Sequence, residues 1–405
     1  MLFNLKLGLV FHAVVALAAC QPKEQGEVHV QAVASAPLAP DHIIVAASPA
    51  QGDRTGKFAI APTFDSAASF SQGLAAVEQN GKWGYIDKVG RMVIDPQFGS
   101  ARKFAANGLA QVVVGGTGDR WVEGRLVPDG KHGYINKQGK FLVNPQFDDA
   151  KEFSEKLAPV RVGDFDTGQW GFVDEEGKIV IEPQFSDVGG FVRGTATVVV
   201  GDKTNRKLGL IDRNGKFILN PEFDGLLRSE DSDLIAYAVS GKWGVMDAKL
   251  NVLITPQFDD MSPFSGGLAP VRIGGYAPGK WGYINTSGTF VINPQFDRAN
   301  LFVDGRAAIY VGDVLKGKWG FIDATGKTVV SPQFAWPPSY FSEGLSAVIV
   351  GDSTDTGALG YIDKQGKYAI NPQFGAFFGS SFSEGLAVVR VGDAKTGKFG
   401  YINRR

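Results

Sequence analysis

Cysteine and histidine, two side chains that often support catalysis or bind metals, are scarce in this 405-residue sequence. Cys20 is the only cysteine, so no internal disulfide can form and the stability of the fold must come from packing. Three of the four histidines, His12, His29 and His42, lie near the start of the chain, which leaves His132 alone in the remainder. A histidine-dependent catalytic triad or a multi-histidine metal site is therefore not expected. We predict no catalytic residue, no metal site and no cofactor.

The chain also lacks a net charge that would attract a polyanion. Its formal net charge is −1, so a nucleic-acid partner is not expected. Gly115, Gly116 and Gly118 form a glycine cluster, but no helix pattern follows them, as a phosphate-binding loop would require. Asp164 and Asp166 lie in one of several Val-Gly-Asp segments, whose spacing is not that of a calcium loop. These segments are interpreted as hairpin turns.

The first 19 residues have the pattern of a secretory signal peptide. Lys6 precedes an apolar run over residues 7–19, which is too short for a membrane span. The end of this run, Leu-Ala-Ala-Cys at residues 17–20, resembles the lipobox of bacterial lipoproteins. That resemblance implies cleavage before Cys20 and lipid modification of this cysteine. The alternative is an ordinary cleaved signal and a freely soluble periplasmic or secreted protein.

Residues 20–52 are rich in Ala, Pro, Ser and Gln and hold no strand or helix period for long. This composition predicts a lipidated Cys20 followed by a flexible tether to a folded body over residues 53–405. Gln21 follows Cys20, and in lipoproteins of Gram-negative bacteria this would imply the outer membrane. The expected location is the bacterial cell envelope, with the outer membrane or the periplasmic face favoured.

The body is built from a repeat whose clearest copy is residues 81–104, GKWGYIDKVGRMVIDPQFGSARKF. The second glycine of the motif recurs at Gly84, Gly133, Gly171, Gly209, Gly244, Gly282, Gly320, Gly360 and Gly400. Nine copies, with seven of their eight spacings between 35 and 40 residues and the first at 49, indicate stacked or radially arranged units rather than one conventional core.

Each unit is predicted to be a three-stranded antiparallel meander followed by a connector. Residues 82–87 alternate apolar and polar side chains, residues 87–90 form a turn, and residues 91–95 pair back. Pro96 ends the ladder because it has no amide hydrogen to donate. The next apolar run, residues 108–114, begins the following unit. The fold class is therefore all-β, with about nine tandem meander units.

The two ends of the body complement each other. Residues 53–64 match the turn and third strand of a unit with no preceding strand, whereas residues 398–403 form a second strand with nothing after them. If the ends meet, these strands complete one meander, as in the closure of β-propellers. A closed propeller-like ring is favoured, and an open β-solenoid is the alternative.

The units resemble the WG-containing repeat family of bacteria, as in GQWGFVDEEGKIVIEPQF, GKWGYINTSGTFVINPQF and GKWGFIDATGKTVVSPQF. The resemblance covers the body from about residue 53 to the end. It implies a β-rich repeat of envelope and secreted proteins, without an agreed activity that could be assigned to particular residues.

The repeat tryptophans are interpreted as structural core. Other units carry His132, Leu208, Leu359 or Phe399 at this position, and leucine shares the bulk of tryptophan without its stacking face. Stacking platforms for sugar or choline are the alternative. The tryptophans are Trp83, Trp170, Trp243, Trp281 and Trp319.

Two insertions are the candidates for partner binding. Residues 112–131 contain Trp121 and Arg125, and residues 335–340 contain Trp336 and Tyr340. Tryptophan, tyrosine and arginine are enriched in binding hot spots. The alternative is that these side chains cover sheet edges or fill local gaps in the core.

The sequence predicts an exported envelope lipoprotein that acts as a non-catalytic binding or interaction scaffold. Its partner is an unidentified envelope protein or glycan, and its contact with the membrane is through the lipid anchor. The alternative function is a glycan-active enzyme of the envelope that uses carboxylates from scattered loops.

Overall fold

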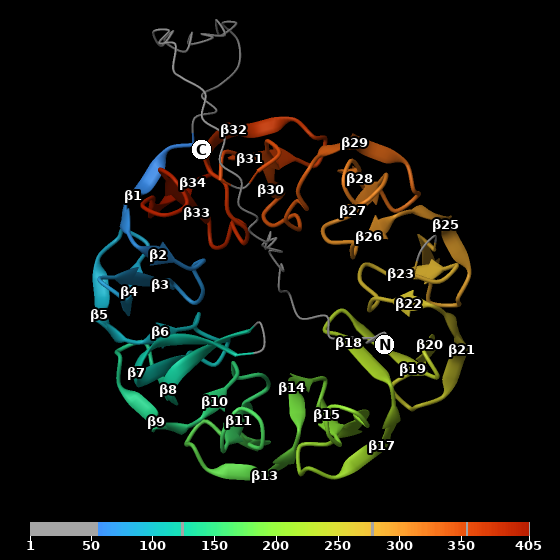
Figure 1. The fold of residues 1–405 in the computed structure, drawn as a ribbon, viewed down its shortest axis with the longest axis horizontal. Coiled ribbons are helices and arrows are strands. Elements are labelled where there is room, and N and C mark those ends of the chain that lie inside the picture. Colours follow the sequence, from blue (N-terminus) through green and yellow to red (C-terminus); the bar gives the residue numbers. More distant parts are fainter. Residues whose placement is uncertain (1–55, 123–124, 277–278, 354, 405) are drawn as a thin grey trace, which may run out of the picture. The chain divides into compact units, whose positions relative to one another are not determined.

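The computed structural model describes residues 56–122, 125–276, 279–353 and 355–404. The predicted signal peptide, Cys20 and the tether lie outside these residues. Residues 54–405 form one compact unit. All regular elements in the described part are antiparallel β-strands, arranged as sheets around a ring (Figure 1).

Nine repeat units make up this ring. Unit 1 contains β2 (Ser66–Ala67), β3 (Leu74–Gln79), β4 (Lys82–Asp87) and β5 (Met92–Phe98). Unit 2 contains β6 (Ser100–Ala101), β7 (Ala110–Val122), β8 (Arg125–Ile135) and β9 (Phe141–Phe147). Unit 3 contains β10 (Asp149–Ala150), β11 (Ala158–Val162), β12 (Gln169–Val173) and β13 (Ile179–Phe185). Units 4 and 5 are β14 (Asp187–Val192), β15 (Thr195–Val200), β16 (Lys207–Ile211) and β17 (Phe217–Phe223); and β18 (Gly225–Ser229), β19 (Ser232–Val239), β20 (Lys242–Met246) and β21 (Val252–Phe258).

Units 6 and 7 are β22 (Asp260–Met261), β23 (Leu268–Ile273), β24 (Lys280–Asn285) and β25 (Phe290–Phe296); and β26 (Arg298–Ala299), β27 (Ala307–Val311), β28 (Lys318–Ile322) and β29 (Thr328–Phe334). Unit 8 contains β30 (Leu345–Val350), β31 (Ala358–Asp363) and β32 (Tyr368–Gly375), and unit 9 contains β33 (Leu386–Val391), β34 (Lys398–Asn403) and β1 (Phe58–Phe64). Units 8 and 9 share one six-stranded sheet, because Gly375 pairs with Arg390, so the nine units form eight hydrogen-bonded sheets.

The predicted meander is confirmed, with one correction and one addition. Pro96 does not end the ladder, because β5 continues past it at a bulge and Phe98 pairs with Trp83. Units 1 to 7 each have three longer strands and a further strand on the inner side, which in five of them is only two residues long. Ser66 and Ala67 pair with Glu78 and Val77 in this way. A pair this short carries no period, which is why the connector gave no strand signal in the sequence.

The second glycine of the motif is needed where the last two strands of a unit approach each other. In unit 6 the register shifts between the pairs Trp281–Phe296 and Tyr283–Ile292, which marks a β-bulge. A Cβ atom on Gly282 would lie 2.5 Å from the Ile292 carbonyl oxygen and 2.7 Å from the Pro294 nitrogen. The bulge also accommodates Pro294, which cannot donate to the ladder.

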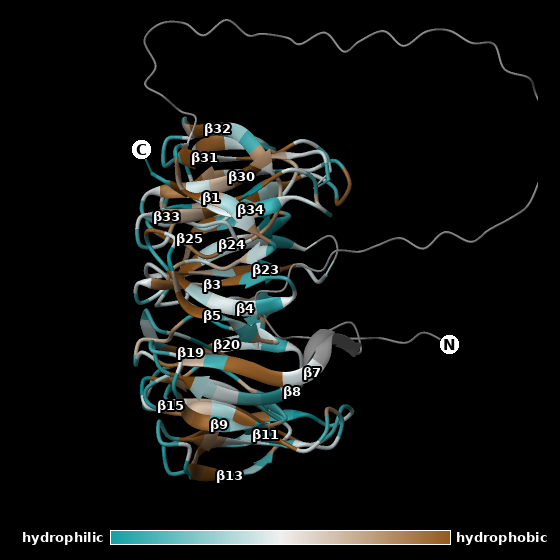
Figure 2. Cartoon of the chain, turned by 90° about the vertical axis from the view of Figure 1, so that its left-hand side faces the viewer, coloured by the Kyte–Doolittle hydropathy of each residue, from teal (hydrophilic) through white to brown (hydrophobic). Residues whose placement is uncertain are grey.

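The core lies between neighbouring units rather than within one unit. One buried cluster contains Tyr85, Ile94 and Phe98 of unit 1 together with Val112 and Ile135 of unit 2. The strands are correspondingly rich in apolar colour and the connecting turns in hydrophilic colour (Figure 2). Each unit therefore needs a neighbour on both sides to bury its two faces.

The ring closes where the sequence predicted. β1 pairs antiparallel with β34, through Phe58–Ile402 and Phe64–Phe399, and the two lie side by side in Figure 1. The contacts at this seam repeat those inside the chain: Tyr401 donates its hydroxyl to the Ala68 carbonyl at 2.8 Å, as Tyr85 does to Arg102 at 2.7 Å. The closed ring is confirmed, and the open solenoid is not observed.

Candidate functional site

The strand connections define two faces of the ring. One face carries the hairpin loops that contain the Val-Gly-Asp segments, among them residues 163–168, 201–206, 312–317 and 392–397, and we call it the loop face. The opposite face, the turn face, carries the short inner turns around residues 71–74 and their equivalents, and the Asp-x-x-Gly turns. Because every unit has the same topology, the loops of all units gather on one side.

The acids of the loop-face hairpins bind backbone amides of their own turns. The Asp164 carboxylate accepts hydrogen bonds from the Asp166 and Thr167 amides at 3.1 and 2.8 Å. Asp202 and Asp393 make equivalent bonds. The Thr167 hydrogen bonds lower the pKa of the Asp164 carboxyl. Within the described residues no group of three acidic, histidine or cysteine side chains could hold a metal ion.

A second recurring contact fixes the connectors between units on the same face. Lys131, Lys207, Lys242 and Lys280 pair with Asp148, Asp224, Asp259 and Asp297 at 2.5 to 2.6 Å, and Lys398 pairs with Asp65 across the seam. Each aspartate also accepts a backbone hydrogen bond, such as that from Gly163 to Asp148 at 2.8 Å. The hydrogen bond from Lys242 lowers the pKa of Asp259. These aspartates therefore connect the segment that leads into the next unit to the strands of the ring.

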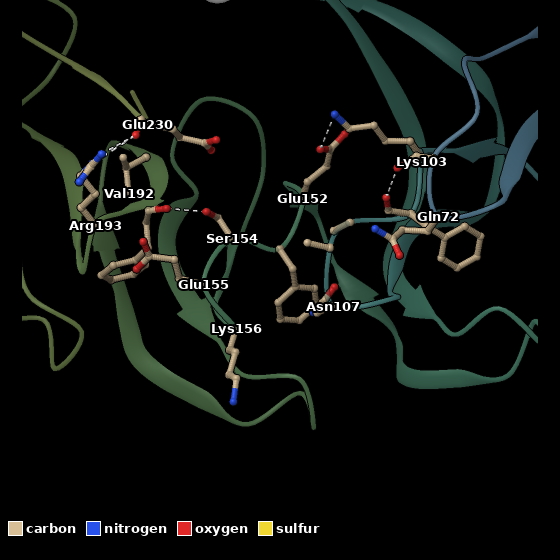
Figure 3. A pocket seen from close by; sticks show the side chains of 16 residues that line it. Gln72, Lys103, Asn107, Glu152, Ser154, Glu155, Lys156, Val192, Arg193 and Glu230 are labelled. Atoms are coloured by element: carbon tan, nitrogen blue, oxygen red, sulfur yellow. Dashed lines mark hydrogen bonds and ion pairs between the residues drawn. The ribbon is translucent and has the colours of Figure 1, made fainter. Parts of the chain in front are cut away.

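The turn face contains a hollow of about 560 Å³ between the inner turns of units 1 to 5 (Figure 3). Its charged side chains are largely engaged with each other and with the backbone. Lys103 lies 3.5 Å from Glu152, Arg193 donates to the Glu230 carbonyl at 2.7 Å, and Glu155 accepts from the Gly194 amide at 2.9 Å. The hollow is thus lined by contacts that join consecutive units.

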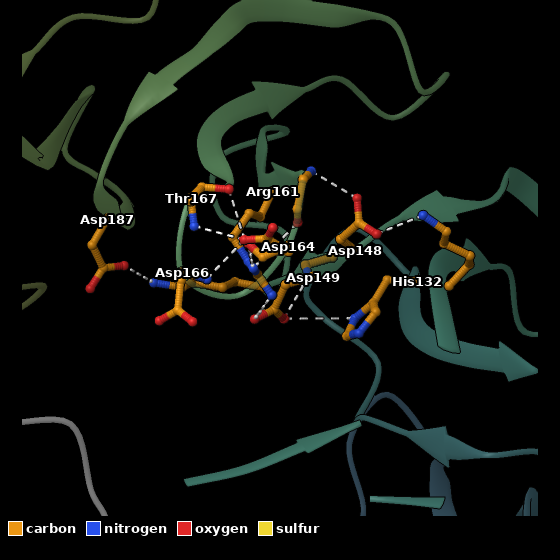
Figure 4. Close-up of polar contacts among 12 residues, drawn as sticks. His132, Asp148, Asp149, Arg161, Asp164, Asp166, Thr167 and Asp187 are labelled. Carbon is orange, nitrogen blue, oxygen red and sulfur yellow. Dashed lines mark hydrogen bonds and ion pairs between the residues drawn. The ribbon is translucent and has the colours of Figure 1, made fainter. Parts of the chain in front are cut away.

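His132 lies buried in β8, at the position of the repeat tryptophan. Its Nδ1 lies 2.8 Å from the Gln111 amide nitrogen and 3.8 Å from a carboxylate oxygen of Asp149, which Arg161 also approaches (Figure 4). Its Nε2 is buried and has no hydrogen-bond partner in the described part of the chain. Burial lowers the pKa of His132, against the opposing effect of Asp149.

The structure places all five repeat tryptophans within their units. Trp170 and Trp319 are buried, and Trp83, Trp243 and Trp281 are half-buried. Each ring pairs across the strands with the phenylalanine of the same unit, as Trp281 does with Phe296. Two of these rings lie against a cationic side chain. Lys151 Nζ lies 4.5 Å from the centre of the Trp170 ring, and the Arg272 guanidinium lies 5.8 Å from the centre of the Trp281 ring.

The predicted partner-binding residues are not brought together as one group. Trp121 and Arg125 belong to the paired backbone of β7 and β8, where Trp121 faces Leu126, and their side chains lie outside what the structure describes. Trp336 is half-buried, with its ring edge-to-face against Phe378 at 5.8 Å. The Tyr340 hydroxyl oxygen accepts a backbone hydrogen bond from Leu301, and burial raises its pKa.

Exposed apolar side chains of the loop face were not among the sequence candidates. Tyr276 is 92 % exposed, Leu315 92 % and Val314 77 %, and they lie in the corresponding loops of units 6 and 7. The available signal was composition, because Val314 and Leu315 are two successive apolar residues, whereas the other Val-Gly-Asp loops have at most one at these two positions.

Comparison with known proteins places the fold but not a partner. One solved structure, titled as a crystal structure of the eukaryotic initiation factor, is similar at 11% identity with a TM-score of 0.51, covering 78% of this chain and 89% of that one. A structure of prolyl endopeptidases has a TM-score of 0.41 at 11% identity, covering 63% of this chain and 49% of that one. No curated protein sequence matches. At this identity the likeness concerns the fold alone.

A family model settles the relationship at the level of the repeat. The model described as WG containing repeat matches nine times, at residues 53–83, 83–117, 133–164, 170–203, 209–243, 243–276, 281–314, 319–352 and 360–393. These matches cover more than half of the chain, and each runs from the later strands of one unit into the first strands of the next. The chain therefore belongs to the WG-containing repeat family.

Proposed function

We propose that this protein is an exported, lipid-anchored protein of the bacterial cell envelope that binds a partner and performs no chemistry itself. The repeat-built propeller suggests a binding or scaffold role. The envelope location rests on the signal-like residues 1–19 and on Cys20. The partner is an envelope protein or glycan, for which a rigid ring with variable loops offers a preorganised surface.

One observation carries this proposal: the frame is the same from unit to unit, whereas the loop face differs. The Lys–Asp pair recurs in five units, whereas the exposed side chains Tyr276, Val314 and Leu315 belong to the loops of units 6 and 7. Exposed apolar side chains on adjacent loops are a feature of interaction sites. We place partner binding on this part of the loop face, with Trp121 and Arg125 as further candidates.

The experiment is capture of a partner from envelope extract by the purified full-length protein. Replacing Val314 and Leu315 by serine should abolish capture, and Tyr276→Ser should weaken it. Val252→Ser is the matched control, because Val252 is 55 % exposed on β21, away from the loop face, and should not alter capture. Unchanged capture by the loop variants would contradict the proposal.

The same preparation tests the enzyme alternative. Incubation with envelope glycan should release no new reducing ends. Release that is lost on replacing one loop aspartate, while binding survives, would favour the glycan-active enzyme.

The lipid anchor is tested by fatty-acid labelling in a bacterial host. The wild-type chain should be labelled, and the Cys20→Ala variant should not.

A further inference from the structure

Three units carry a buried arginine at the same place, near the end of the strand that enters the loop face. These are Arg161 in unit 3, Arg272 in unit 6 and Arg390 in unit 9, with exposed fractions of 4, 9 and 7 %. Each faces the ring at the tryptophan position across the strands: Trp170, Trp281 and Phe399. Three of the other units have Val113, Val199 or Ile349 there, and the remaining three have Glu78, Ala238 or Tyr310, so the fold does not require an arginine.

In units 3 and 6 the buried guanidinium lies beside a carboxylate of the same unit. Arg161 lies 3.6 Å from Asp149, and Arg272 lies 3.1 Å from Asp260. Both acids belong to the Asp-Asp pair that follows the Pro-Gln-Phe segment. A buried cation is costly unless an anion compensates it, and these two aspartates supply that anion.

Unit 9 has the buried cation without the aspartate of units 3 and 6. The exposed Asp393 interacts electrostatically with Arg390, but the two form no ion pair within 4.0 Å. Gly375 and Ala376 stand where the Asp-Asp pair stands in units 3 and 6. Arg390 donates to the Ala376 carbonyl at 2.6 Å, and its buried Nε has no hydrogen-bond partner among the described residues. No carboxylate of the described residues forms an ion pair with Arg390 within 4.0 Å. Arg272 shares the unpartnered Nε, so the missing carboxylate is what distinguishes unit 9.

The junction between units 8 and 9 is altered in two further ways. Ala358 replaces the lysine of the recurring Lys–Asp pair, opposite Gly375. The segment that leads from the Pro-Gln-Phe motif to the next inner turn is one residue longer in unit 8 and two residues longer in unit 9 than in units 3 and 6. Aromatic rings of the two longer segments are in contact, Trp336 with Phe378. Trp336 Nε1 is a second buried donor that has no hydrogen-bond partner in the part of the chain that the structure describes. Phe377 joins this cluster to Phe399, the ring opposite Arg390, at 5.2 Å.

We propose that this junction binds an organic carboxylate, with Arg390 as its ion-pair partner and the half-buried rings of Trp336, Phe377 and Phe378 contacting its apolar part. The ligand carboxylate takes the place of the aspartate that unit 9 lacks. The inference rests on the proposed binding role and names the chemistry that one part of the loop face recognises. A hydrogen-bonded charge pair to arginine is among the stronger polar contacts available.

Benzoate is the probe, because it joins a carboxylate to one aromatic ring, and benzyl alcohol is its uncharged control. Calorimetric titration of the full-length protein should show one benzoate per chain and no binding of benzyl alcohol. Arg390→Met should weaken benzoate binding by about tenfold or more, the effect of losing a charged hydrogen bond. Methionine is suitable because units 2, 4 and 8 have the apolar residues Val113, Val199 and Ile349 at the equivalent position.

Asp260→Ala provides a matched gain of function within the same chain. It leaves Arg272 without its carboxylate, as Arg390 is, and should add a second, weaker benzoate site, because Met261 and Ser262 stand where unit 9 has Phe377 and Phe378. Absence of binding to the wild-type protein, or full binding to Arg390→Met, would overturn the inference. Partner capture from envelope extract is a separate readout, so capture that persists while benzoate fails to bind would refute this site and leave the proposed function standing.

Discussion

Replacing Gly282 by alanine should destabilise the ring more than the same change at a glycine with no close neighbour. Gly282 is the second glycine of the motif in unit 6. An added Cβ would lie 2.5 Å from the Ile292 carbonyl oxygen and 2.7 Å from the Pro294 nitrogen. Both are backbone atoms, so neither can rotate away, and β24 and β25 would have to separate at the bulge.

The magnitude follows from the nature of these contacts. Overpacking against a well-packed interior typically costs about 1–3 kcal/mol, and contacts with backbone place Gly282→Ala near the upper end. The matched control is Gly305→Ala, in an inner turn of unit 7. Gly305 has a φ of 76°, and an added Cβ would meet no atom within 4 Å. Its cost is the left-handed backbone alone, about 1 kcal/mol.

Equilibrium unfolding in urea measures the difference. Gly282→Ala should lose about 2 kcal/mol more of the free energy of unfolding than Gly305→Ala, at an unchanged denaturant slope. Gly244→Ala, which has the same contacts in unit 5, should behave like Gly282→Ala. Equal losses at Gly282 and Gly305 would refute the argument that close strand approach fixes the motif glycine.

Two other changes test the seam and the buried histidine. Tyr401→Phe removes the hydrogen bond to the Ala68 carbonyl and should lower the free energy of unfolding by about 1 kcal/mol. Tyr85→Phe, which removes the equivalent bond between units 1 and 2, should cost the same. If Tyr85→Phe is destabilising and Tyr401→Phe is not, the seam is open in solution. Because burial lowers the pKa of His132, the unfolded chain takes up its proton first, and stability should fall as the pH drops below 6.5 towards the folded-state pKa. His132→Leu should remove that part of the pH dependence in urea unfolding, and an unchanged profile would contradict the assignment.

The repeat made most of the fold predictable. Gly84 and its eight equivalents fix the number of units, and the alternation around Trp83 and Tyr85 fixes the longer strands. The incomplete units at residues 53–64 and 398–403 predicted closure, because strand edges must be paired. The two-residue inner strands could not be predicted, since a pair such as Ser66–Ala67 is defined only by its partner strand.

The candidate site was less predictable, because it depends on what is missing as much as on what is present. Trp336 stood out as a tryptophan outside the repeat position. The meaning of Gly375 and Ala376 appears only once Arg390 is seen buried, with Asp149 and Asp260 beside the equivalent arginines. Burial and pairing are tertiary properties, and an arginine in a strand pattern gives no sign of them.

Closure of the ring by β1 and β34 is tested most directly by a disulfide across the seam. With Cys20 replaced by serine, cysteines at positions 58 and 402, which are paired in the structure, should form a crosslink within one chain under oxidation. Cysteines at positions 58 and 252, on strands of units 9 and 5, serve as the control and should remain free. Failure of the 58–402 pair to crosslink in the folded protein would contradict the closed ring.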